Sequence, residues 1–100
     1  MKTEIFNQYA QRVSELFDLK QDELFTKCKR RVVVDARHLL YYLCWKRPMR
    51  ISYIQKYMME KGYKIQHSSV IHGIGMVEEK IKSDRDYVSI VRNIEKSVFI

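Results

Sequence analysis

Apolar residues recur at intervals of three and four along almost the whole chain. Over residues 3–17 they are Ile5, Phe6, Tyr9, Val13, Leu16 and Phe17, the stripe of an amphipathic helix. No segment reads as a credible strand. A chain of 100 residues, 46% apolar, with one Pro and three Gly, is long enough for one domain around one modest core. We therefore predict a single domain over residues 1–100, an all-α compact bundle of about five to six helices.

Further helices follow the first one along the sequence. A short acidic turn is predicted at 21–25, and the widest apolar face, over 31–47, predicts the most buried helix, which Pro48 ends. The last helix starts after Ser83. The residues expected to face inward on the later helices are Val32, Val33, Ala36, Leu39, Leu40, Leu43, Cys44, Ile54, Tyr57, Met58, Val70, Ile74, Val77, Ile81, Tyr87, Val91, Ile94 and Val98.

Two consecutive helices over residues 52–82 have the order of a helix-turn-helix. Ser52 and Gln55 form an S-x-x-Q capping box, and Gly62 occupies the usual C-cap place, which predicts a short helix at 53–61. A longer helix is predicted at 67–82. The turn between them is a little longer than in the strict motif.

Positive charge is concentrated in the middle of the chain. The net charge is +7, but residues 26–73 hold eleven Lys and Arg against two acids, whereas the remainder holds eight basic and ten acidic residues. The stretch 27–31 is predicted to be a solvated basic loop because four of its five side chains are basic. This distribution suits a polyanionic partner, although a merely solubilising surface would have the same charge.

Membrane and secreted classes are not expected. The longest apolar stretch, "VVVDARHLLYYLCW", contains Asp35, Arg37 and His38 and is shorter than a membrane span. The first residues do not resemble a signal peptide, and Cys28 and Cys44 form no Cys-x-x-Cys pattern. We expect reduced thiols and a cytoplasmic location.

The segment "IQHSSVIHG", residues 65–73, combines polar side chains at a helix start. His67 and His72 would stand about 140° apart around a helix axis, which disfavours a shared metal. The serines lack the "GxSxG" elbow of a nucleophile, and Gly73 and Gly75 form no phosphate loop. We therefore expect no enzyme activity, cofactor, metal or small-molecule substrate. The glycines are better explained by close approach of a neighbouring helix, as at the crossing of a helix-turn-helix pair.

A DNA-reading role uses the same polar residues. The first turn of a helix has free N–H groups and a partial positive charge, so it can approach a phosphate while short polar side chains reach base edges. Gln66, His67, Ser68 and Ser69 form that turn, and glutamine can pair with adenine through two hydrogen bonds. The alternative is that Gln66 and Ser68 simply cap the helix.

The segments "VSELFDLKQDELFTKCKRR", "VVVDARHLLYYLC", "QHSSVIHGIGMVEEKI" and "DRDYVSIVRNI" resemble a known family. It is the C-terminal DNA-binding domain, domain IV, of the bacterial replication initiator DnaA, a Trp-repressor-like fold. The resemblance runs from about Ile5 to Val98, and "HSSVIH" is similar to the family signature D-H-T-T-V-x-H. Members of the family bind short duplex sites called DnaA boxes. The resemblance implies a small stand-alone DNA-binding protein without the initiator's ATPase domain.

The resemblance also implies roles for individual residues. Lys29 matches a minor-groove arginine in the basic loop, and Ser68 matches a threonine that contacts a base. The other matched positions are Arg31 and Arg37 near phosphates, Ser52 and Tyr53 near the backbone, the signature histidine at His67, and the second threonine at Ser69. The chain departs from the family at Gln66 for aspartate, Lys29 for arginine, Trp45 for a basic residue, and "KGYKIQ" for "G-G-R-D", which counts against a standard DnaA box as the target.

The sequence thus predicts sequence-specific binding of double-stranded DNA in replication initiation or its regulation. We expect a nucleoid-associated protein of a bacterial or phage-infected cell, with a replication protein as a further partner. Base reading is assigned to Lys29, Gln66, His67 and Ser68, and backbone contact to Arg30, Arg31, Arg37, Ser52, Tyr53, Lys64 and Ser69. One alternative is a helical interaction protein that binds a replication or transcription factor. Another is single-stranded nucleic acid stacked on Tyr41, Tyr42, Trp45 or Tyr63.

Overall fold

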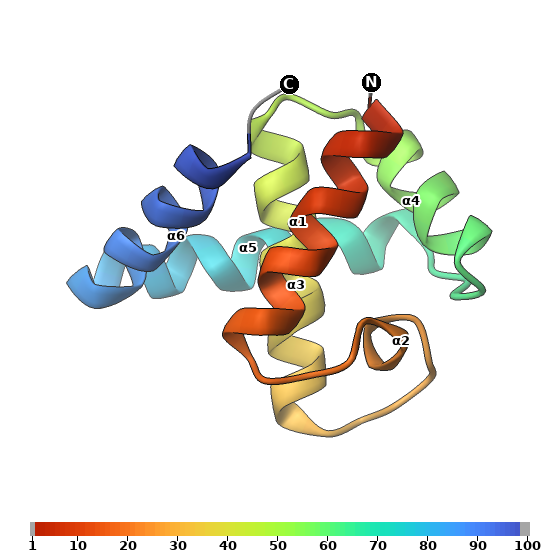
Figure 1. Ribbon diagram of the computed structural model, residues 1–100, viewed down its shortest axis with the longest axis horizontal. Coiled ribbons are helices and arrows are strands. Elements are labelled where there is room, and N and C mark those ends of the chain that lie inside the picture. The colour runs from red at the N-terminus through yellow and green to blue at the C-terminus, as the bar shows by residue number, and fades with distance from the viewer. Residues whose placement is uncertain (1, 99–100) are drawn as a thin grey trace.

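Six α-helices account for most of residues 2–98, the part of the chain that the computed structural model describes (Figure 1). No strand occurs within this range, so the predicted all-α bundle is confirmed. The helices are α1 (Lys2–Leu16), α2 (Gln21–Leu24), α3 (Arg31–Lys46), α4 (Ile51–Glu60), α5 (His67–Ser83) and α6 (Arg85–Ser97).

Helix α3 runs through the centre of the bundle and contacts α1, α2, α4 and α5 (Figure 1). The prediction that this segment is the most buried helix is confirmed, because its inward face is almost completely removed from solvent. Its buried residues are Val33, Ala36, Arg37, Leu39, Leu40, Tyr41, Tyr42, Leu43 and Cys44. The core therefore forms around α3, and the other helices are held in place by packing against it.

Helix α1 buries a slightly different face from the predicted one. Leu16 is 44% exposed, whereas Ser14 is buried, and the Ser14 hydroxyl donates to the Gln11 carbonyl at 2.8 Å. The chain turns at Asp18, whose φ is 55°, and Phe17 then packs partly against the core. Leu16 is left outside because the helix ends at that residue and the chain changes direction.

Helices α4 and α5 contact each other and are joined by residues 61–66. The predicted capping box is wrong, because α4 begins at Ile51 after the N-cap residue Arg50, which makes no side-chain cap. Gln55 Nε2 instead donates to the Ile65 carbonyl at 3.2 Å and ties α4 to the connection. Gly62 has a φ of 100°, the left-handed conformation expected of a residue that ends a helix.

Gly73 allows α5 to approach α3 closely. A Cβ added to Gly73 would lie 2.8 Å from Cδ2 of His38 and 2.9 Å from Cδ2 of Tyr41, both on α3. The predicted close approach of a helix is therefore confirmed at Gly73, but the neighbour is α3 rather than α4. It is wrong for Gly75, where an added Cβ would meet nothing within 4 Å.

Candidate nucleic-acid interface

The first turn of α5 lies at the surface. Gln66, His67, Ser68 and Ser69 are exposed, and Val70 is the first buried residue of the helix. Gln66 is the N-cap residue, but its side chain makes no cap hydrogen bond, so the capping explanation of this glutamine is not supported. Because Val70, together with Ile74 and Val77 further along the helix, holds α5 in the core, the polar first turn is presented to solvent by a rigid element.

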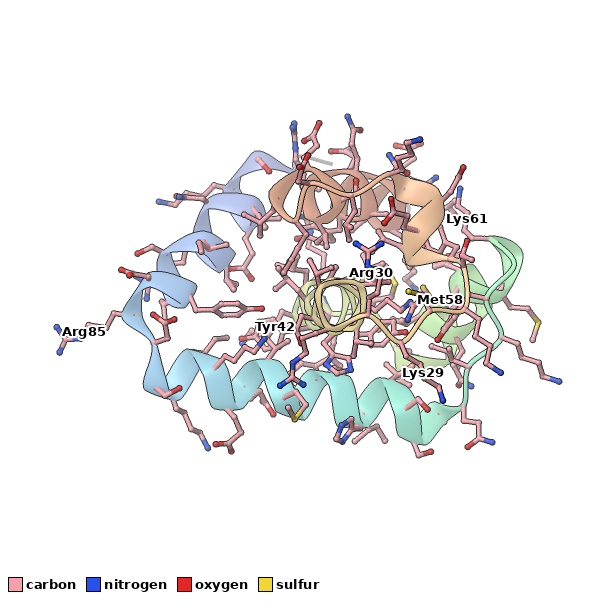
Figure 2. The ribbon with its side chains drawn as sticks, turned by 90° about the horizontal axis from the view of Figure 1, so that it is seen from below. Lys29, Arg30, Tyr42, Met58, Lys61 and Arg85 are labelled. Atoms are coloured by element: carbon pink, nitrogen blue, oxygen red, sulfur yellow. The ribbon has the colours of Figure 1, made fainter. Side chains whose placement is uncertain are left out.

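A hollow of about 620 Å³, here called the loop-side hollow, lies between the basic loop and α5. Its wall is formed by Lys27, Cys28, Lys29, Val34, Arg37, His38, Tyr41, Tyr63, Ile65, Ser68, Ser69 and His72. Figure 2 shows Lys29 beside the start of α5. Four predicted site residues from separate segments of the chain, Lys29, Arg37, Ser68 and Ser69, are thus brought to one surface depression.

A second hollow of about 420 Å³, here called the α4-side hollow, adjoins the same turn of α5. It is lined by Trp45, Pro48, Met49, Arg50, Ile51, Ser52 and His67. Two more predicted site residues, Ser52 and His67, therefore meet here. Since His67 borders this hollow while Ser68 and Ser69 border the loop-side hollow, the first turn of α5 stands between the two.

Arg37 belongs to the wall of the loop-side hollow but has almost no exposed surface. The residue is 4% exposed, and its guanidinium donates to the carbonyls of Leu24 at 2.8 Å, Cys28 at 3.1 Å and Thr26. Its Cζ also lies 4.3 Å from the centroid of the Tyr63 ring. These internal hydrogen bonds disfavour the predicted backbone contact by Arg37. Arg37 instead holds the chain that leads into the basic loop.

The remaining predicted residues lie at the surface but outside the walls of the two hollows. Arg31 and Lys64 are exposed, and Arg30 is exposed with its Nη1 3.6 Å from Oε2 of Glu23. Tyr53 is half-buried, with Lys2 Nζ 4.3 Å from its ring centroid. The Tyr53 ring therefore faces α1, and the structure does not bring it to Ser52 in the α4-side hollow.

Sequence reasoning missed two histidines in the loop-side hollow. The rings of His38 and His72 lie 5.8 Å apart, centroid to centroid, at an interplanar angle of 85°. Burial lowers the pKa of His38 below its ordinary value, and the nearby His72 lowers it further, whereas Asp35 acts in the opposite direction. His72 could have been found because it lies four residues after Ser68, on the same helix face. His38 carried no such signal, since it is embedded in an apolar run.

Trp45 and Arg50 were not among the predicted base-reading or backbone residues, although Trp45 was considered as a stacking platform. Trp45 is 37% exposed and packs on Tyr42, with the ring centroids 6.2 Å apart. Both residues border the α4-side hollow. The sequence did contain a signal for this site, because Trp45 is an aromatic residue directly before two basic residues, Lys46 and Arg47.

The proposed stacking platforms for single strands are mostly unavailable. Tyr41 is 3% exposed and Tyr42 is 8% exposed, so neither ring has a free face for a base. Tyr63 is half-buried against Arg37. Trp45 alone among these four rings is exposed, and a single platform does not favour a single-strand mode.

The cysteines show no reactive arrangement. Both thiols are free; Cys28 is half-buried and its Sγ accepts a hydrogen bond from the Arg30 N–H at 3.4 Å. Burial raises the pKa of the Cys44 thiol. Within residues 2–98, no group of three or more His, Cys, Asp or Glu side chains is arranged to hold a metal ion.

The interface therefore offers positive charge and hydrogen-bond donors on both sides of an exposed helix turn.

No helix in residues 2–98 has the length and apolar character to cross a membrane. A scan against protein-family models finds no match for the chain. The geometry of the site, together with the sequence resemblance, consequently carries the functional conclusion.

Proposed function

We propose that the protein binds double-stranded DNA in a sequence-specific manner, with α4 and α5 acting as a helix-turn-helix. The observation that carries this proposal is the loop-side hollow, in which Lys29 meets Ser68 and Ser69. The major groove of B-DNA admits one α-helix. Placing the first turn of α5 in that groove would bring Gln66, His67 and Ser68 to base edges.

The two hollows support an assignment of the DNA backbones. A helix in the major groove has one sugar-phosphate backbone on each side. In our proposal one backbone follows the loop-side hollow, near Lys27, Lys29 and Ser69, and the other follows the α4-side hollow, near Arg50 and Ser52. Lys29 also reaches the adjacent minor groove. Arg30, Arg31 and Lys64, which are exposed, add sequence-independent attraction that salt weakens.

The resemblance to DnaA domain IV gives the proposal its biological setting. We propose a role in replication initiation or its regulation, in which this domain contributes DNA recognition and no ATPase or other catalytic activity. The departure at Gln66 predicts a preference for adenine where the family's aspartate suits cytosine. A replication protein would be a further partner in this setting.

The proposal is tested by electrophoretic mobility shift with a pool of random duplexes at about 50 mM salt, followed by a salt titration. We expect a shift at micromolar protein and an affinity that falls as salt rises. Lys29→Ala should weaken the shift. Arg85→Ala is the matched control, because it removes one positive charge at the far end of the molecule from α5's first turn (Figure 2). No shift, or equal losses for both variants, would contradict the proposal.

The alternative is an interaction protein that binds a replication or transcription factor, for which the exposed apolar residues of α5 are the candidate contacts. Ile71 is 49% exposed and Met76 is 39% exposed on α5, and the two residues stand about 140° apart around the helix axis. If a protein partner contacted either residue, Ile71→Ser or Met76→Ser would weaken its binding. Absence of a duplex shift would favour this alternative.

A further inference from the structure

His38 and His72 bring two imidazole rings from different helices into the loop-side hollow. The edge-to-face arrangement at 5.8 Å joins α3 to α5, and the same hollow is lined by Lys27 and Lys29. The hollow therefore brings two imidazole rings, the side chain whose ordinary pKa lies nearest neutral pH, beside two lysine side chains.

The ring of His38 is held in position by the backbone of α5. Because Gly73 has no side chain, Cδ2 of His38 occupies the space that a Cβ at residue 73 would need. The ring also lies 6.4 Å from that of Tyr41, centroid to centroid. His38 is thus a fixed member of the wall, whereas His72 is exposed on the first two turns of α5.

The charged groups around His38 come from several elements. Burial disfavours its protonation most, followed by the nearby His72, whereas Asp35 favours protonation; Lys80 from α5 and Arg37 disfavour it to a smaller extent. Asp35 is itself engaged, since its Oδ2 lies 3.5 Å from Lys80 Nζ. The hollow is also bordered by Lys27 and Lys29 of the basic loop and by Cys28, Tyr63, Ser68 and Ser69. In the free protein burial, and then these charges, lower the pKa of His38 and so favour its neutral form.

An anion in the hollow would reverse this preference. A phosphate beside an imidazole stabilises the protonated ring, which then donates charge-assisted hydrogen bonds. We infer that a DNA phosphate occupies the loop-side hollow and that the His38–His72 pair takes up a proton as the duplex binds. This inference rests on the proposed DNA-binding function. Proton uptake would make the affinity for DNA depend on pH. Contacts by Lys and Arg alone would not have this effect between about pH 5 and pH 8.

The test measures the affinity for a pool of random duplexes of about twenty base pairs at constant salt, from about pH 8 to pH 5.5. For uptake of one proton, the affinity should rise as pH falls by up to about tenfold per pH unit. The double variant H38Q/H72Q should bind with a nearly flat pH profile. H67Q is the matched control, because His67 borders the other hollow; it should bind more weakly but keep the slope of the wild type.

A second readout does not depend on comparing variants. The pKa of each imidazole is followed by NMR with and without the duplex, and duplex binding should raise the pKa of His38 or His72. A pH-independent affinity, a slope retained in H38Q/H72Q, or a slope lost in H67Q would overturn the inference and leave the DNA-binding proposal standing. No duplex binding at any pH would overturn both.

Discussion

Gly73 and His38 lie so close together that a Cβ added to the glycine would be 2.8 Å from Cδ2 of the imidazole. This contact seats α5 against α3 and places one wall of the loop-side hollow. The same pair therefore links the packing of the bundle to the proposed DNA-binding surface.

Gly73→Ala should destabilise the protein by about 1–3 kcal/mol, because the new methyl group would overpack the α3–α5 contact. The matched control is Gly75→Ala, where an added Cβ meets nothing within 4 Å. It should stabilise α5 by about 0.5–1 kcal/mol through better helix propensity. Urea unfolding measures both changes. Equal stabilisation by the two substitutions would show that α5 does not approach α3 as described.

Folding stability should decrease as the pH falls below about 6.5, the ordinary pKa of histidine. The native state lowers the pKa of His38 by burial and by the nearby His72, so the unfolded chain binds a proton more readily than the folded one. This contribution is complete above pH 6.5 and is lost as pH falls toward the folded pKa. His38→Gln should flatten this part of the stability profile, measured by thermal unfolding. The opposite sign, greater stability at lower pH from this residue, would contradict the buried position of His38.

Arg37→Leu should destabilise the fold by about 2–4 kcal/mol, because the carbonyls of the loop lose their buried donors. Residues 24–30 should then become more accessible to proteases. Arg31→Ala is the matched control, since Arg31 is exposed at the start of α3. It should change stability by less than about 0.5 kcal/mol and reduce the salt slope of duplex binding by about 1. Equal stability of the two variants would argue against the internal role of Arg37.

Binding of a duplex should change the fluorescence of Trp45. This residue is the sole tryptophan of the sequence, and it borders the α4-side hollow together with Ser52 and His67. A DNA backbone placed there would remove water from the indole, so emission should change in proportion to complex formation. Emission that stays constant while a mobility shift shows binding would place the DNA elsewhere.

The helices could be predicted from the sequence because their apolar spacing follows the helical repeat. Local residue types also determine two of the helix ends. Helix α3 stops before Pro48, and Gly62 adopts the left-handed conformation after α4. The capping box failed because Gln55 found a partner outside its own helix, the Ile65 carbonyl. Such a tertiary partner leaves no trace in local spacing.

The site could be predicted only in part, for the same reason. Polar residues in the first turn of α5 stand out because they precede an apolar stripe, and the basic loop stands out by composition. The burial of Arg37 could not be predicted, because it depends on three backbone carbonyls in residues 24–28, which precede α3. His38 was missed because only the α3–α5 contact places it beside His72.

Selection of bound duplexes from a random library tests the central claim most directly. The wild type should enrich a short motif, and Gln66→Ala and Ser68→Ala should each relax preference at their own position, by about 1–3 kcal/mol per lost base contact. Arg31→Ala should bind more weakly and enrich the same motif. No enriched motif, or uniform losses that leave the motif unchanged in all three variants, would show that the first turn of α5 does not read DNA sequence.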